Sequence, residues 1–193
     1  FQYFGITDDV DYRKLKWTRG KYDICELEKV YTADLKRCSL VLESVKKYVA
    51  DMDEVKGLGF CVSVAHADYM SMYFNKHGVP SISLSAKSID DIREDAKQDL
   101  VDGKIKFIFV VDLYNEGVDI PQVNTVLFLR PTESATVFLQ QLGRGLRLSP
   151  GKDCLTILDF IGQANKKYNF AMKFESMVGK GRKSLRKQIE DGI

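Results

Sequence analysis

The segment KFIFVV (residues 106–111) decides the fold class of this chain, because it is a short, nearly continuous apolar run rich in aromatic and β-branched residues. Such runs are typical of strands that are buried on both faces of a parallel sheet. Similar short segments at 60–64, 81–84, 125–129 and 155–160 are predicted to be further strands of the same sheet.

Amphipathic helices are predicted before and between these strands. One is expected over 32–51, with Thr32 as its N-cap, and one over 67–77, ended by Gly78 in a left-handed conformation. Another is expected over 89–102, with Ser88 as its cap. Its inward stripe would be made of Ile89, Ile92, Ala96 and Leu100. Strands that alternate with helices predict an α/β fold, with a mostly parallel sheet and helices on both faces.

The composition suits one ordinary globular unit. The chain has 193 residues, of which 45% are hydrophobic and 29% are charged, and its net charge is only +2. No apolar run approaches the roughly 18 residues of a membrane span, and no signal peptide is visible, so we expect a cytoplasmic protein without membrane contact. The four cysteines form no C-x-x-C pair, which favours reduced thiols over zinc or disulfides. Because the first residue is Phe1 and not Met, we expect a piece of a longer protein.

Three parts are expected along the chain. Residues 1–54 would form an N-terminal linker and a helix that lead into the domain, and residues 55–162 would form its core. Residues 163–193 would be a basic helical extension, because they hold eight Lys and Arg against three Asp and Glu. This extension could contact a phosphate backbone, or it could be a solvated helix that leads to a further domain.

The loop after the 106–111 strand is a candidate binding site, because ligands of open parallel sheets bind at the carboxyl ends of the strands. In this loop Asp112, Glu116 and Asp119 cluster around Gly117. Glycine permits close backbone approach, and a carboxylate beyond such a turn is well placed to accept hydrogen bonds from ribose hydroxyls. An acidic surface turn is the alternative interpretation. No metal site is predicted, because no histidine lies near these carboxylates in the sequence.

The segment FLQQLGRGLRLSP (138–150) is predicted to be a helix with two opposed faces. One face carries Gln140, Arg144 and Arg147 at i, i+4 and i+7, and Gly143 leaves bare backbone beside them. This face suits close approach to a polyanion, and a solvated basic face is the alternative. The chain holds no G-x-x-x-x-G-K-[ST] motif, so we do not expect it to bind and hydrolyse a nucleoside triphosphate by itself in the P-loop manner.

Three segments, in their usual order, resemble motifs of superfamily 2 helicases. Residues 59–66 (GFCVSVAH) resemble motif IV, residues 115–121 (NEGVDIP) resemble motif V, and Gln140-x-x-Gly143-Arg144-x-x-Arg147 resembles motif VI. The phrases LRPTES, FLQQLGRGLR and LDFIG are similar to bacterial DEAD/DEAH-box helicases related to type III restriction enzyme subunits. Two positions depart from the pattern: Val111 stands where many relatives have Thr, and Asp90-x-x-Arg93 stands where relatives often have Gln-x-x-Arg.

The resemblance implies a RecA-like three-layer sandwich that is the second motor domain of an ATP-dependent helicase. The P-loop and DExx motifs would lie on a missing N-terminal RecA-like domain, and ATP would bind between the two domains, with Mg²⁺ held mainly by the N-terminal one. Arg144 and Arg147 would act as arginine fingers on the γ-phosphate, and Gln140 would contact the phosphate region or the attacking water. The other residues implied on the nucleotide side are Gly117, Asp119 (at the ribose), Glu116 and Gly143.

The resemblance also implies that nucleic acid lies along the loops at the strand ends. The implied contacts are Ser63, His66, Ser85, Asp112 and Leu113. For His66, a local structural role is the alternative. DNA is favoured over RNA as the partner, and nuclease or other domains of the parent protein could be further partners. This part alone is expected to be inactive, and the alternative function is a non-catalytic RecA-like module that docks nucleic acid or protein.

Overall fold

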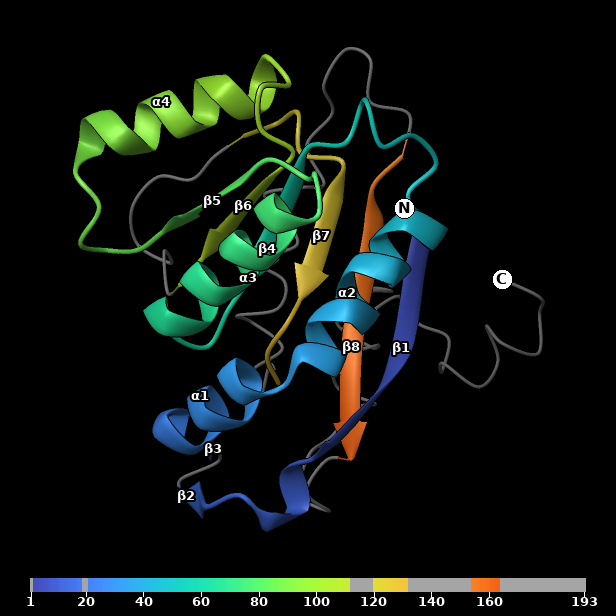
Figure 1. Ribbon diagram of the computed structural model, residues 1–193, viewed down its shortest axis with the longest axis vertical. Helices are drawn as coiled ribbons and strands as arrows, with labels where there is room; N and C mark the ends of the chain where they lie inside the picture. Colours follow the sequence, from blue (N-terminus) through green and yellow to red (C-terminus); the bar gives the residue numbers. More distant parts are fainter. Residues whose placement is uncertain (1, 19–20, 112–119, 132–153, 164–193) are drawn as a thin grey trace, which may run out of the picture.

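The computed structural model describes residues 2–18, 21–111, 120–131 and 154–163. Within them, six strands form one sheet in which all neighbours are parallel, in the order β1-β8-β7-β4-β6-β5 (Figure 1). The strands are β1 (Gln2–Asp11), β4 (Gly57–Phe60), β5 (Ser81–Leu84), β6 (Phe107–Val110), β7 (Thr125–Phe128) and β8 (Thr156–Gln163). The predicted parallel sheet is confirmed.

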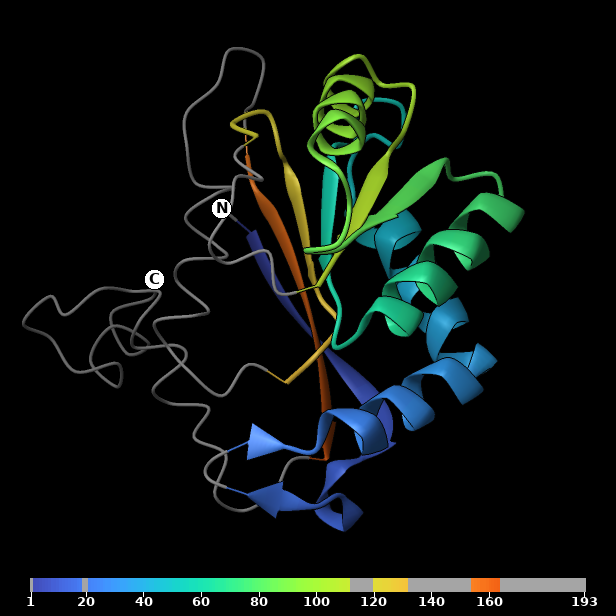
Figure 2. The ribbon, with the colours of Figure 1, turned by 90° about the vertical axis from the view of Figure 1, so that its left-hand side faces the viewer.

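Helices cover both faces of this sheet. In the described part of the chain they are α1 (Ile24–Ala33), α2 (Leu35–Tyr48), α3 (Val64–Lys76) and α4 (Asp90–Val101). Figure 2 shows α1, α2 and α3 on one side of the sheet, and α4 packs Ala96 and Leu100 into the core on the other side. A 3-10 turn, η1 (Tyr12–Lys14), and a hairpin of β2 (Trp17–Thr18) and β3 (Lys21–Tyr22) connect β1 to α1. The three-layer arrangement is therefore confirmed.

Strand β6 divides its side chains between two apolar cores. Phe107 and Phe109 face α2 and α3, where Phe74 of α3 meets both rings edge-on at centroid distances of 5.3 and 5.0 Å. Ile108 and Val110 face the core that includes α4. All four residues are buried, which explains why this strand lacks the polar alternation of a half-exposed strand.

Two glycines of β4 leave room for the β6 rings. A Cβ on Gly57 would lie 2.1 Å from the ring of Phe107, and a Cβ on Gly59 would lie 2.4 Å from the ring of Phe109. Real Cβ atoms are not found so close to other atoms, so side-chain-free backbone is required under both rings. The central strand is thereby able to pair closely with β6 while bulky rings lie across it.

The helix predicted over 32–51 occurs as α2, but its bounds and its N-cap were wrong, and α1 before it was not predicted. Asp34 caps α2 by accepting hydrogen bonds from the N–H groups of Lys36 and Arg37. Thr32 lies at the end of α1, where its hydroxyl donates to the carbonyl of Glu28 over 2.8 Å. Asp is at least as strong an N-cap as Thr, so the helix begins after Asp34 and not after Thr32.

The helix predicted over 89–102 occurs as α4, but its cap and part of its stripe were wrong. Ile89 occupies the N-cap position without a side-chain hydrogen bond, and Ser88 instead accepts the N–H of Ser85 over 3.0 Å. Ile89 and Ile92 are 65% and 43% exposed, while Arg93, one residue along, is buried. The helix is thus rotated about its axis relative to the predicted stripe, and Ala96 and Leu100 alone face the core as expected.

The first 54 residues contribute directly to the sheet and its core. Strand β1 pairs with β8 along a register from Gln2↔Thr156 to Thr7↔Ile161 and forms one edge of the sheet. Helix α2 buries Val41 and Val45 in the core that α3 shares. We expected a linker and helix leading into the domain, and the structure shows an integral edge strand together with covering helices.

Candidate nucleic-acid and nucleotide interface

Most of the predicted site residues lie outside the described part of the chain. They are Gln140, Gly143, Arg144 and Arg147 of the motif VI segment, and Asp112, Leu113, Glu116, Gly117 and Asp119 of the loop after β6. Their roles therefore stay predictions. The other three, Ser63, His66 and Ser85, are described, and they follow the carboxyl ends of β4 and β5.

The residues that flank the predicted ribose loop are firmly anchored. Val111, just before it, is buried and donates its N–H to the carbonyl of Leu84 over 3.3 Å. Ile120, just after it, is buried in the core on the α4 side, and its carbonyl accepts the N–H of Val123 over 3.1 Å. Val111 and Ile120, the described residues on either side of segment 112–119, are therefore both fixed in buried positions.

Ser63 is the N-cap of α3. Its hydroxyl oxygen accepts the N–H of His66 over 3.2 Å, and its side chain retains only slight exposure, 9%, at the carboxyl end of β4. The first turn of a helix presents unpaired N–H groups that favour anions. Ser63 thus lies where a phosphate contact is chemically reasonable, although its hydroxyl is already engaged by the helix.

His66 is a buried structural residue, which was the alternative interpretation of this histidine. Its side chain is fully buried, its Nδ1 accepts the N–H of Val62 over 3.3 Å, and its ring lies 4.7 Å from the ring of Tyr31. Burial lowers the pKa of the imidazole well below its usual range, and the nearby Arg37 cation lowers it further, so the ring is neutral. A neutral, inaccessible ring does not suit direct contact with a phosphate.

A buried arginine at the same edge was missed in the sequence. The Nε of Arg37 lies 2.7 Å from Oδ2 of Asp8, and an Nη2–H donates to the carbonyl of Leu129 over 2.9 Å. Asp8 lies between the inward-facing Ile6 and Val10 of β1. That alternation was the available signal, because a carboxylate at an inward position of a strand requires a buried partner.

The loop after β5 is held from within by Arg93. The Arg93 guanidinium donates to the carbonyls of Ala86 and Ser85 over 2.8 and 3.3 Å, and to Oδ1 of Asp90 over 3.2 Å. Ser85 Oγ accepts the N–H of Lys87 over 3.3 Å. Ser85 is therefore part of a closed turn, and Arg93, the arginine of the Asp90-x-x-Arg93 variant, stabilises that turn.

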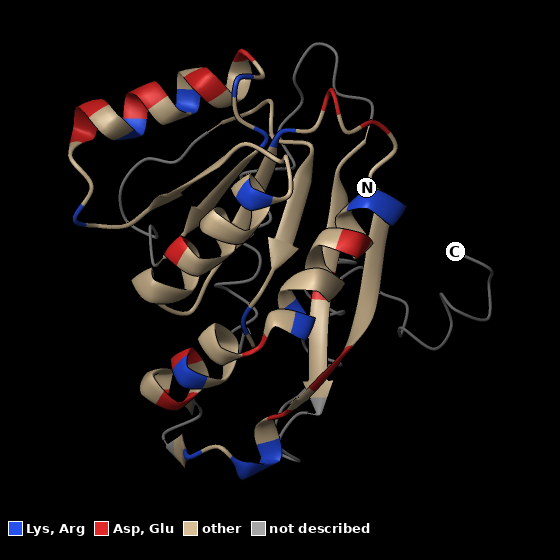
Figure 3. Cartoon of the chain, viewed as in Figure 1, with Lys and Arg blue, Asp and Glu red and all other residues tan. Residues whose placement is uncertain are grey.

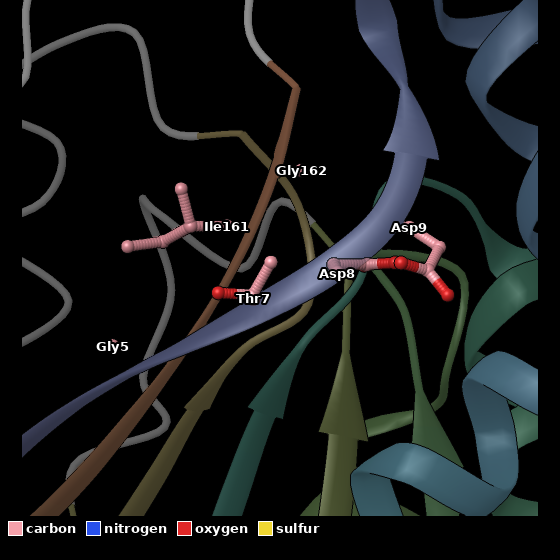
Figure 4. Close-up of a pocket in the computed structure, with 6 residues that line it drawn as sticks. All are labelled: Gly5, Thr7, Asp8, Asp9, Ile161 and Gly162. Carbon is pink, nitrogen blue, oxygen red and sulfur yellow. The ribbon is translucent and has the colours of Figure 1, made fainter.

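Helix α4 and a pocket beside β1 are two further features of the described surface. Helix α4 carries Asp90, Asp91, Glu94, Asp95 and Asp99 against Arg93 and Lys97, so its surface repels a polyanion (Figure 3). A pocket of about 290 Å³ beside β1 and β8 is lined by Gly5, Thr7, Asp8, Asp9, Ile161 and Gly162 (Figure 4). No predicted site residue lines it.

Among the described residues there is no group of three or more His, Cys, Asp or Glu that could hold a metal ion. The same residues include no helix that is long and apolar enough to cross a membrane.

Proteins similar to this chain in sequence occur in a phage, a bacterium and a eukaryote. The chain is 27% identical over 157 residues to a 51.5 kDa protein of a Lactococcus phage, covering 81% of this chain and 33% of that protein. It is 31% identical over 122 residues to the type I restriction enzyme EcoKI endonuclease subunit of Escherichia coli, covering 57% and 10%. It is 29% identical over 93 residues to the ATP-dependent RNA helicase DHH1 of Encephalitozoon cuniculi, covering 48% and 19%. The chain thus spans a third or less of these relatives.

A solved structure and a family model agree on the domain type. The E. coli DEAD-box protein SrmB, solved bound to the regulator of ribonuclease activity A, matches with a TM-score of 0.58 at 15% identity over 83% of this chain and 76% of that one. This likeness shows the fold, which is that of a RecA-like helicase domain. The family model for the helicase conserved C-terminal domain matches residues 40–149, more than half of the chain. The chain therefore belongs to the helicase conserved C-terminal domain family.

Proposed function

We propose that this chain is the second motor domain of an ATP-dependent nucleic-acid helicase or translocase. The observation that carries the proposal is the family match over residues 40–149, which includes both the motif V segment (115–121) and the motif VI segment (140–147). The parallel sheet supports it, because ligands of such sheets bind at the strands' carboxyl ends, where the 112–121 segment begins.

The nucleotide side of the site would be completed by an N-terminal RecA-like domain of the parent protein. Arg144 and Arg147 would face the γ-phosphate of ATP bound by that domain and stabilise the charge that develops during hydrolysis. Gln140 would contact the phosphate region or the attacking water, and Asp119 would accept hydrogen bonds from the ribose, with Gly117 permitting the approach. We place Glu116 and Gly143 beside the nucleotide, and Mg²⁺ mainly on the N-terminal domain.

The nucleic-acid side would follow the carboxyl edge of the sheet. Ser63, at the first turn of α3, and Ser85, in the turn held by Arg93, lie at the ends of β4 and β5. Together with Asp112 and Leu113 they would contact the sugar-phosphate backbone, which carries little sequence information. His66 would support this edge from beneath and not touch the ligand. DNA is favoured by the resemblance to restriction subunits, whereas three of the relatives are named RNA helicases.

The decisive experiment is the substitution Arg144→Ala in the full parent protein. Loss of an arginine finger lowers turnover by about 10³-fold or more, so we expect ATP hydrolysis to fall by that factor while nucleic-acid binding persists. Arg13→Ala is the control, because Arg13 is an exposed arginine that pairs with Asp11 after the carboxyl end of β1 and lies outside the motif V and motif VI segments. Unchanged ATP turnover in Arg144→Ala would refute the finger assignment and favour a non-catalytic docking module.

The isolated chain offers a second test. It should show no ATP hydrolysis alone and should regain it only with the N-terminal domain. Binding of single-stranded DNA and RNA by the chain, titrated with salt, should weaken steeply as salt rises if the contacts are to phosphates. Binding that does not respond to salt would contradict the proposed backbone contacts.

A further inference from the structure

A single buried arginine, Arg37 of α2, contacts residues from three separate parts of the chain. Its Nε lies 2.7 Å from Oδ2 of Asp8 in β1, and its Nη2–H donates to the carbonyl of Leu129, just after β7, over 2.9 Å. Its Nη1 lies 3.5 Å from Nε2 of His66 in α3. The side chains of Arg37 and Asp8 are only 1% and 3% exposed, so these contacts are made away from water.

The shape of the guanidinium, and not only its charge, is used at this position. Its planar fork of donors reaches Asp8 and the Leu129 carbonyl together, and its carbon lies 4.0 Å from the ring centroid of Tyr31. The hydroxyl of Tyr31 donates to that of Tyr12 over 2.7 Å, which holds the ring in place. A lysine would carry the same charge on one nitrogen and could not meet both acceptors in this geometry.

Stability alone explains this arrangement poorly. Replacing a buried ion pair by apolar residues of similar size is often neutral or even stabilising, because the desolvation of two charges offsets their attraction. What the buried Arg37–Asp8 pair provides, and apolar residues would not, is a directional contact that fixes the relative positions of the segments it joins.

The contacts of Arg37 converge on the two loops that leave the sheet after β4 and β7. The N–H of Leu129 donates to the carbonyl of Phe60 over 3.1 Å, so the ends of these strands are tied together. The ring of His66 accepts a backbone N–H from the loop after β4 over 3.3 Å. Arg37 therefore contacts the loop after β7 through the Leu129 carbonyl and the loop after β4 through His66. Ser63, which accepts the N–H of His66, belongs to the second of these loops.

We propose that Arg37 is a positioning residue for nucleic-acid binding, which holds segments 60–66 and 129–131 in their binding geometry. The nucleic-acid part of this inference rests on the proposed function. Arg37 itself touches no ligand, because it is buried behind the loops. The inference also assigns a role to residues 2–37, which supply Asp8, Tyr12, Tyr31 and the arginine itself.

Hydrogen exchange on the intact chain tests the positioning role without any ligand. The variant is Arg37→Lys, which keeps the charge and removes the fork, and the control is Arg13→Lys, whose exposed guanidinium is 2.8 Å from Asp11. In Arg37→Lys we expect exchange in segments 60–66 and 129–131 to rise on the order of tenfold, while segments 81–84 and 96–101 stay within about twofold. Arg13→Lys should change none of them. Asp8→Asn, which keeps an acceptor oxygen, is the second variant and should give a smaller rise confined to the same segments.

The affinity for a fluorescent single-stranded oligonucleotide supplies the second readout, measured well below the melting temperature of each variant. Arg37→Lys should weaken binding roughly five- to twentyfold, and Arg13→Lys should leave it unchanged. Native exchange in both loops, an equal rise across the whole chain, or an unchanged affinity would each overturn the proposal. If the unmodified chain binds no oligonucleotide, the proposed nucleic-acid contacts fail, and the exchange pattern still decides whether Arg37 positions the loops.

Discussion

Truncating Asp8 to alanine would leave the Arg37 guanidinium buried without its carboxylate. Both side chains are almost fully buried, and 2.7 Å separates Oδ2 from Nε, so the pair is desolvated and directly bonded. Removing one partner of such a pair costs about 3–5 kcal/mol, because the remaining charge is uncompensated. The N–H of Val10 also loses its acceptor, Oδ1 of Asp8, at 3.2 Å. Since domains of this size are stable by about 5–15 kcal/mol in total, Asp8→Ala should lose a large fraction of the free energy of unfolding.

Urea unfolding at pH 7 measures this loss. With a slope near 2 kcal/mol/M, the midpoint should fall by about 1.5–2.5 M at unchanged slope. Asp11→Ala is the matched control, because Asp11 makes a similar contact with Arg13, at 2.8 Å, on the surface, and its midpoint should move far less. The double variant Asp8→Leu, Arg37→Met removes both charges and should recover part of the loss, because the Val10 N–H and the Leu129 carbonyl still lack their partners. A midpoint shift for Asp8→Ala no larger than that of Asp11→Ala would refute this reasoning.

The remaining predictions concern His66 and Gly59. The folded pKa of His66 lies below its usual 6.5, so the unfolded chain binds the extra proton and stability falls as the pH falls through 6.5. Between pH 7.5 and 5.5 this should cost on the order of 1 kcal/mol in urea unfolding, and the cost should disappear in His66→Gln and persist in the exposed control His77→Gln. Gly59→Ala should cost about 1–3 kcal/mol in thermal unfolding, because its Cβ would lie 2.4 Å from the ring of Phe109. Gly5→Ala, whose Cβ would lie 3.2 Å from Cδ1 of Ile161, should cost less stability. Equal losses of stability in the two variants would show that the ring of Phe109 moves aside at little cost.

Local pattern was sufficient for three strands of the sheet and for the family, but the strand predicted over 60–64 was misplaced, because β4 is Gly57–Phe60 and α3 begins at Val64. The predicted strands at 81–84, 106–111 and 125–129 occur as β5, β6 and β7, within one residue at their ends. Their apolar runs determine burial on both faces wherever the partner strands lie, so the sequence alone indicates them. The helicase motifs were likewise readable, because they are fixed spacings of residue types and the family match spans them.

The buried face of a helix could not be predicted from hydrophobic periodicity alone. The stripe of α4 predicted Ile89 and Ile92 as core residues, yet Arg93 is buried there because two carbonyls of the preceding turn accept its guanidinium. Hydrophobic periodicity considers only apolar side chains, so it does not predict the burial of an arginine that donates hydrogen bonds to backbone carbonyls. The N-cap was misplaced by two residues, because Thr32 and Asp34 are both residue types that favour the N-cap position.

The sequence by itself determined the α/β class, most of the strands and the family of this protein. Only the tertiary structure decided that β1 completes the sheet beside β8, and that Asp8, Arg37, His66 and the Leu129 carbonyl meet at its carboxyl edge. These partners are separated by 29 to 92 residues along the chain. A local pattern specifies which face a residue prefers, whereas the partner of a buried charge is specified only when the sheet has brought distant segments together.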